Sequence, residues 1–237
     1  MNNIFKDCLS LQKINFTNFN TTKVIDMSYM FYGCRSLQKL NLSNFNTNNV
    51  TNMSHMFYEC LKLSELNLSS FNTKNVHNME NMFFECKELT ELILSSFSTE
   101  NVNNMSGMFK NCYKLQKLNL SNFNTAKVET MGSMFEKCYS LVELNLNNFN
   151  TNNCTDMSGM FSKCKSLKEL NLSSFDTNKV TRMYYMFSNC QSLTELNISN
   201  FNINKEADIS NMFLGCKNLK QSSKIKQITG EKSCICI

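Results

Sequence analysis

The chain has 237 residues, and its 24 basic and 19 acidic side chains give a formal net charge of +5. Proline is absent and there are six glycines, so the residues that usually separate independent domains are scarce. Lysines and glutamates are mixed along the chain, which does not suit a nucleic-acid-binding surface with a basic stripe.

The sequence repeats itself every 26 residues. A Met-Phe pair, a Leu-x-Leu pair and a further phenylalanine all keep this step, without insertion or deletion between residues 4 and 219. Regular apolar columns of this kind exclude a disordered asparagine-rich tract and predict one continuous array of repeats. The same step separates nine cysteines: Cys8, Cys34, Cys60, Cys86, Cys112, Cys138, Cys164, Cys190 and Cys216.

Two patterns follow each other within each repeat. Residues 37–45, LQKLNLSNF, alternate apolar and polar side chains, which predicts a short half-buried strand. In residues 49–63, NVTNMSHMFYECLKL, apolar residues recur at steps of three and four, which predicts a short helix or helical turn that begins at Asn52. A threonine column lies in the connecting loops, where we expect its hydroxyls to bond backbone groups.

One strand and one helix cannot bury their apolar faces alone, whereas stacked repeats can. We therefore predict an α/β solenoid over residues 1–219. It is a right-handed array of about eight repeats, with one short parallel strand and one short helix in each. Eight strands about 4.8 Å apart make a sheet on the order of 35 Å long.

The cysteine column has three interpretations. Disulfides between adjacent coils would leave one of the nine equivalent cysteines over. Zinc is disfavoured because the repeat holds no Cys-x-x-Cys and the chain has two histidines, His55 and His77. We favour a small buried apolar residue in each repeat, because Met, Phe and Leu columns surround it. No metal and no cofactor is expected.

The repeat pattern ends after Leu219. Residues 220–237 contain four lysines and one glutamate, and we expect them to form a flexible basic tail. The last four residues, Cys234 to Ile237, have the form of a C-a-a-X prenylation motif with Cys234 as the modified residue. One lipid chain and a basic tail together predict attachment to an anionic membrane surface. A frayed terminus that happens to end in cysteines is the alternative.

The first residues lack the basic start and apolar run of a secretory signal, and no stretch is long enough to span a membrane. These features and the expected free thiols favour the cytoplasmic face of a membrane, with the cell surface as the alternative. The chain starts inside a repeat, so an absent N-terminal cap or a truncated start also stays open.

Two columns of outward-facing strand positions are the candidate binding face. One column carries lysine or glutamate, and the charges either orient a partner or are simply solvated. The other carries asparagine, or isoleucine once, and forms either a structural amide ladder or a polar recognition floor. The candidate binding residues are Lys13, Lys39, Asn41, Glu65, Asn67, Glu91, Ile93, Lys117, Asn119, Glu143, Glu169 and Glu195.

A second candidate surface is an aromatic patch confined to the first repeats. Tyr32, Tyr58 and Phe84 occupy one column, and Tyr29 lies in the adjacent column beside His55. In later repeats the first column carries Lys110, Glu136, Ser162 and Ser188. Such a patch is typical of an interaction or self-association site. Protection of the N-terminal end is the other interpretation.

The repeat resembles a known family. Leu37, Leu40 and Leu42 resemble the Leu-x-x-Leu-x-Leu core of leucine-rich repeats, although Phe45 stands where many of them carry asparagine. With NVTNMSHMFYEC, the whole unit is similar to the 26-residue repeat of BspA-like leucine-rich-repeat surface proteins. The resemblance implies a binding or adhesion surface in bacteria or protist parasites, and no enzyme.

No nucleophile–base pair, phosphate loop or carboxylate pair departs from the repeat, so catalysis has little support in the sequence. We therefore predict a non-enzymatic protein–protein interaction scaffold tethered by prenylation to the cytoplasmic face of a membrane. Its partner is a protein of unknown identity, nucleic acid is not expected, and the oligomeric state is open. A cell-surface adhesin is the alternative.

Overall fold

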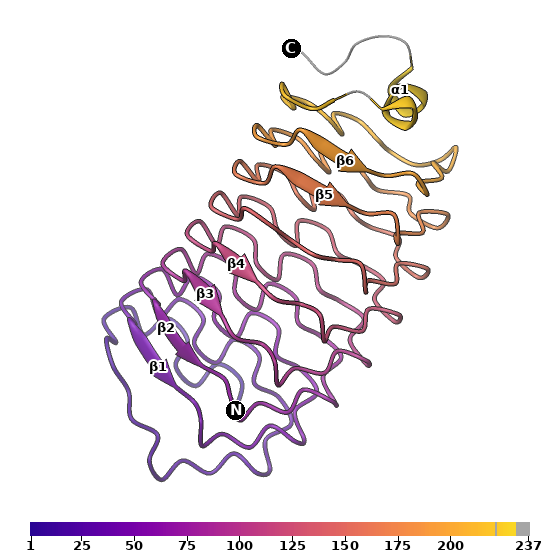
Figure 1. Ribbon diagram of the computed structural model, residues 1–237. Helices are drawn as coiled ribbons and strands as arrows, with labels where there is room; N and C mark the ends of the chain where they lie inside the picture. Colours follow the sequence, from indigo (N-terminus) through magenta and orange to yellow (C-terminus); the bar gives the residue numbers. More distant parts are fainter. Residues whose placement is uncertain (221, 231–237) are drawn as a thin grey trace.

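The computed structural model describes residues 1–220 and 222–230. Figure 1 shows one stack of coils that runs from the N-terminus to the C-terminus, with the strands side by side on one face. This arrangement confirms the predicted leucine-rich-repeat-like solenoid. Its elements are β1 (Lys39–Asn41), β2 (Glu65–Asn67), β3 (Glu91–Leu92), β4 (Lys117–Leu118), β5 (Glu169–Asn171), β6 (Glu195–Asn197) and α1 (Ser223–Thr229).

The strands pair in parallel between consecutive repeats. β1 pairs with β2, β3 with β4 and β5 with β6, and each residue lies opposite the residue 26 positions later, as Leu40 does opposite Leu66. In the described part of the chain, residues 13–15 and 143–145 form no regular strand, and no strand pairing joins β2 to β3. The continuous eight-stranded sheet is therefore replaced by three two-stranded ladders.

The segment expected to be a short helix is a run of tight turns that bonds to the next repeat. Met53 N donates to Asn78 O over 3.0 Å, and Phe57 N donates to Met82 O over 2.9 Å. Other amides bond three residues back, as Met56 N does to Met53 O at 3.3 Å. In an α-helix, amides beyond the first turn would donate four residues back along their own chain. Of the two predicted alternatives, the helix is therefore wrong and the turn is confirmed, and the apolar spacing correctly placed the buried side chains.

Left-handed backbone conformations make this turn geometry possible. His55 and Glu59 have φ angles of 58° and 55°, and residues at the equivalent positions of other repeats are also in this region. Glycine adopts such a φ without steric cost, and glycine stands in these columns at Gly33 and Gly107. The resulting turns direct amides such as His55 N, which donates to Glu80 O over 2.8 Å, toward the next repeat.

Backbone bridges between the turn segments run without a break along the molecule. They link Asp26, Asn52, Asn78, Asn104, Thr130, Asp156, Arg182 and Asp208 in that order. We call these bridges and the turn segments that follow them, residues 27–34 and their equivalents in later repeats, the turn spine. The turn spine is the continuous hydrogen-bonded ladder of the molecule, whereas the strand ladders are interrupted.

The apolar columns form one core along the stack. From Phe31 to Phe213, each phenylalanine ring stacks on its equivalent in the next repeat, with ring centroids 5.5 to 5.7 Å apart. From Cys34 to Cys216 the repeat cysteines are at most 1% exposed, and all cysteines of the described residues are free thiols. Cys60 Sγ donates to Phe31 O over 3.2 Å. The interpretation as a buried apolar column is confirmed for these residues, while Cys8 is half-buried.

The threonine column joins neighbouring loops, as expected. Thr99 Oγ1 donates to Asn124 O over 2.9 Å and accepts from Asn124 N over 2.8 Å. Its side chain is fully buried. One hydroxyl therefore satisfies both backbone groups of a residue in the next repeat. The column consists of Thr21, Thr47, Thr73, Thr99, Thr125, Thr151 and Thr177, which are all buried.

Helix α1 lies at the C-terminal end of the stack (Figure 1). Ser222 Oγ accepts from Ile225 N over 3.3 Å and caps the helix. Ile225 is fully buried in the core, and Ile228 packs against it. The flexible tail expected from residue 220 is therefore wrong for residues 223–229, because two isoleucines three positions apart give this segment an apolar helical face. Cys234 lies outside the described residues.

Candidate binding face

All twelve residues of the predicted binding face are exposed. The structure divides them between two hollows on the strand face. Lys13, Lys39, Asn41, Glu65, Asn67, Glu91 and Ile93 line the first hollow, of about 650 Å³. Lys117, Asn119, Glu143, Glu169 and Glu195 line the second hollow, of about 960 Å³.

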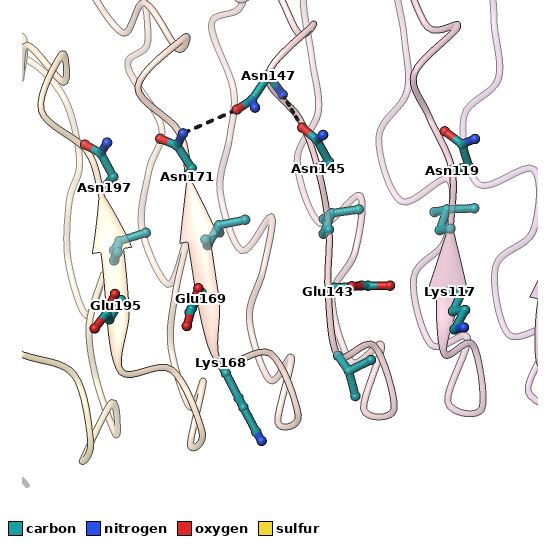
Figure 2. A pocket seen from close by; sticks show the side chains of 15 residues that line it. Lys117, Asn119, Glu143, Asn145, Asn147, Lys168, Glu169, Asn171, Glu195 and Asn197 are labelled. Carbon is teal, nitrogen blue, oxygen red and sulfur yellow. Dashed lines mark hydrogen bonds between the residues drawn. The ribbon is translucent and has the colours of Figure 1, made fainter.

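The second hollow has two parallel rows of polar side chains, as Figure 2 shows. Glu143, Glu169 and Glu195 form one row with Lys117 at its end, and asparagines from the same repeats form the other. The leucine between the two rows on each strand is nearly buried, with Leu196 8% exposed. The floor of the hollow is therefore a line of leucine edges between carboxylates and amides.

The asparagines of this face do not form the amide ladder considered from the sequence. Asn119 Oδ1 accepts from Ser121 N over 3.0 Å, and Asn145 Oδ1 accepts from Asn147 N over 3.0 Å. These Asx turns end each strand segment by using the side-chain carbonyl locally. The one amide–amide bond in the hollow joins Asn171 Nδ2 to Asn147 Oδ1 at 3.4 Å. Because the side-chain carbonyls of these asparagines are bonded locally, their NH₂ groups are the donors that remain on the outward face.

The carboxylate row carries charge that the described residues compensate only in part. Glu195 pairs with Lys220 at 2.8 Å, and this bond lowers the pKa of Glu195 below its ordinary value. No ion pair with another described residue involves Glu143 or Glu169. Glu169 also lies directly opposite Glu195 in the β5–β6 register. Like charges opposite each other destabilise a sheet.

The first hollow has a different character. Lys39 and Glu65 form an ion pair across β1 and β2, so the two charges there neutralise each other. Ile93 is 70% exposed and interrupts the asparagine row between the two hollows. The charge gradient seen in the sequence therefore corresponds to a neutralised hollow near the N-terminus and an acidic one near the C-terminus.

The aromatic patch is a stack of rings along the turn spine. Tyr32 lies 4.6 Å from Tyr58, and Tyr58 lies 4.3 Å from Phe84, with interplanar angles of 6° and 3°. Lys6 lies over Tyr32 at one end and Lys110 over Phe84 at the other. The ring faces are therefore covered, and all three rings are half-buried. The patch presents ring edges to solvent.

The fourth predicted aromatic, Tyr29, stacks on His55 with centroids 4.6 Å apart. Burial lowers the pKa of His55, because desolvation disfavours the imidazolium. His55 Nε2 lies 3.2 Å from Asn81 Nδ2, which makes Nε2 the acceptor of a neutral ring. These aromatic residues line a further hollow of about 510 Å³ together with Ser106, Gly107, Gly132 and Ser133.

The second hollow is also lined by residues that the candidate list omitted. Asn145, Asn171 and Asn197 belong to the predicted asparagine column, and the leucines between the two rows belong to the predicted buried columns. Sequence reasoning had no place for the remaining lining residues, Val142, Asn147 and Lys168. Val142 is 47% exposed and stands where the preceding repeats carry the polar residues Gln38, Ser64, Thr90 and Gln116. An apolar residue in an otherwise polar, outward-facing column was the sequence feature that could have identified Val142 as part of the site. Lys168 lies in the same column and extends away from the glutamates in Figure 2.

No group of three or more histidine, cysteine or acidic side chains arranged to hold a metal occurs within residues 1–220 and 222–230. In the same residues, no helix is both long and apolar enough to cross a membrane.

The chain is similar to several solved bacterial leucine-rich-repeat structures. It is 19% identical to the leucine-rich-repeat protein of T. pallidum, covering 90% of this chain and 79% of that one with a TM-score of 0.41. A leucine-rich-repeat protein of Leptospira interrogans is 18% identical, with 86% of this chain and 48% of that one covered and a TM-score of 0.42. A leucine-rich cell surface protein of Faecalibacterium prausnitzii A2-165 is 18% identical, with 81% of this chain and 62% of that one covered and a TM-score of 0.39. The chain thus spans less than two thirds of the latter two.

No curated protein matches the chain. The family model described as "Mycoplasma protein of unknown function, DUF285" matches residues 1–117, 62–145 and 141–230, which together span the whole array of repeats. The stacked 26-residue coils and this match confirm the resemblance to BspA-like leucine-rich-repeat proteins. The chain belongs to the DUF285 family.

Proposed function

We propose that this protein is a non-enzymatic scaffold that binds a protein partner on its strand face. The observation that carries the proposal is the second hollow, about 960 Å³ in volume and lined by side chains from consecutive repeats. The repeated apolar side chains are buried in the core, so the residues that differ between repeats lie mostly at exposed positions. A rigid face with variable polar side chains suits recognition of another macromolecule.

Site-specific photocrosslinking in the native cell tests this function. A photoreactive residue replaces Glu143 in the second hollow, and in a control replaces Asn152, an exposed loop residue away from it. We expect discrete protein adducts from position 143 that are absent at position 152, with the partner identified by mass spectrometry. Adducts of equal number and identity at both positions, or none at either, would contradict a binding face.

We further propose that the scaffold is held on the cytoplasmic face of a membrane by prenylation of Cys234. The support is the form of the motif Cys234 to Ile237 and the basic residues before it. The motif operates when Ile237 is the carboxyl terminus of the protein in the cell. Mass spectrometry of the native C-terminal peptide shows both whether Cys234 is prenylated and whether the protein ends at Ile237. An unmodified peptide that ends at Ile237 would rule the tether out.

Cell-surface adhesion is the second candidate, supported by the family resemblance to surface proteins. Protease treatment of intact cells separates the two locations. A tethered cytoplasmic protein survives the protease, whereas an adhesin is cleaved under conditions that leave a cytoplasmic marker protein intact.

A further inference from the structure

The second hollow offers two kinds of recognition group in a fixed arrangement. On each contributing strand segment, a charged residue and an asparagine flank one nearly buried leucine, as Glu169, Leu170 and Asn171 do on β5. Both outer side chains are exposed on the same face of the strand. The next repeat presents the same arrangement about 4.8 Å away. The hollow is therefore bordered by a carboxylate row and an amide row.

The amide row selects for acceptors. An asparagine side chain normally offers both a carbonyl acceptor and an NH₂ donor. In Asn119, Asn145, Asn171 and Asn197, the carbonyl already accepts the backbone amide two residues on, at 3.0 to 3.1 Å. A ligand that meets this row therefore encounters N–H groups and must supply oxygen atoms to accept from them.

The carboxylate row selects for cations. Glu143 and Glu169 stand next to each other without an ion-pair partner among the described residues, and Glu169 faces Glu195 in register. Lys117 borders the row at one end, and Lys220 already pairs with Glu195 at the other. Lys168 also lines the hollow but extends away from the glutamates (Figure 2). The unpaired centre of the row is therefore Glu143 and Glu169.

We infer that the partner presents an extended polypeptide segment that carries lysine or arginine to this hollow. This inference rests on the proposed function and names the partner's chemistry. An extended segment has main-chain carbonyls free to accept from the asparagine NH₂ groups, whereas the carbonyls of a helix interior are already bonded. Its basic side chains pair with Glu143 and Glu169 and remove the like-charge repulsion between neighbouring repeats. The nearly buried leucines offer little apolar area, which disfavours an amphipathic helix docked by its apolar face.

Peptide titrations test the charge complementarity. The probe is a labelled, end-blocked heptapeptide in which lysine alternates with serine, and its counterpart carries glutamate in place of lysine. The double variant Glu143→Gln, Glu169→Gln is compared with Glu100→Gln, Glu129→Gln, which makes the same change of net charge at exposed sites away from the hollow.

We expect the lysine peptide to bind the protein and the glutamate peptide not to bind. The double variant Glu143→Gln, Glu169→Gln should raise the dissociation constant of the lysine peptide roughly tenfold, because two exposed ion pairs are lost. The control variant should change the dissociation constant less than about twofold, since distant exposed charges are screened. Absence of binding to the lysine peptide, or equal weakening in both variants, would overturn the inference.

A second variant pair tests the amide donors. Asn145→Asp and Asn171→Asp keep an oxygen that accepts the same backbone amide, so each Asx turn is retained. The outward NH₂ becomes a carboxylate oxygen that repels a peptide carbonyl. If carbonyl contacts matter, the double variant binds the lysine peptide more weakly even though the protein has become more acidic. Tighter binding would show that charge alone acts, and would overturn an extended main chain as the ligand.

The peptide assay and the crosslinking experiment can reject the basic segment and the scaffold function separately. Discrete protein adducts at position 143 together with no affinity for the lysine peptide would retain the scaffold function and reject the basic segment. Specific binding of the peptide without any protein adduct in cells would reject the scaffold function.

Discussion

At the residue scale, single polar side chains repeated at 26-residue steps hold the coils in register. Thr99 is the clearest case, because its buried hydroxyl satisfies both the N–H and the C=O of Asn124 in the next repeat. Because the threonine recurs in successive repeats, removing one hydroxyl measures how much one such contact between adjacent repeats contributes to the free energy of unfolding. A buried backbone group without a partner costs about 1–3 kcal/mol.

We therefore expect Thr99→Val to lower the free energy of unfolding by roughly 1–3 kcal/mol, because valine has the same shape and no hydroxyl. Thr99→Ser keeps the oxygen and should be destabilised much less. Urea denaturation followed by circular dichroism measures both variants. A valine variant as stable as the wild type would show that the loop bonds contribute nothing.

The buried thiols give the protein an alkaline limit. Burial raises the pKa of Cys112, Cys154 and Cys164 to about 12 from 9.0. Because the pKa is higher in the folded state, the stabilisation is complete below pH 9 and is lost as the pH rises toward 12. We expect the free energy of unfolding to fall across that interval, by up to about 1.4 kcal/mol per pH unit for each thiol.

Cys154→Val is the matched control, since Val24, Val50, Val76, Val102, Val128 and Val180 hold the same column in other repeats. This variant should fold normally and show a shallower alkaline loss in urea titrations at pH 9 to 12. An unchanged slope would mean that the Cys154 thiol does not govern alkaline unfolding.

At the element scale, the sequence identified the strand positions and the buried columns but not the nature of the turns. Steps of three and four between Met53, Met56, Phe57 and Cys60 fit a helix and a run of tight turns equally well. The difference lies in where the amides donate, and Phe57 N donates to a residue 25 positions away. A long-range bond of this kind leaves no trace in local periodicity.

Helix α1 was missed for a related reason, because it departs from the repeat and was interpreted as a tail. We expect Ile225→Ala to lower the free energy of unfolding by about 2 kcal/mol or more, since Ile225 is fully buried in the core. Lys226→Ala, an exposed neighbour in the same helix, should change it by less than about 0.5 kcal/mol. Equal effects of the two changes in urea denaturation would show that α1 does not cover the core.

At the scale of the whole molecule, the 26-residue step predicted which side chains share a face, and the candidate binding residues are indeed exposed there. Their division into two hollows was not predictable from the columns alone. It depends on Ile93 interrupting the amide row, on the Lys39–Glu65 pair, and on Val142, whose exposure follows from the stack. The Asx turns likewise appear only when the strand ends are placed, and they convert a supposed ladder into a donor row.

The central claim is that the turn spine, more than the strand ladders, holds the repeats in the register that builds the strand face. Hydrogen exchange of individual amides tests it most directly, because inter-repeat bonds protect amides from solvent. We predict that Met131, Ser133 and Phe135, which donate to Asp156, Ser158 and Met160, exchange far more slowly than the amides of residues 142–147 on the strand face. Equal protection of the two segments, or slower exchange on the strand face, would contradict this account.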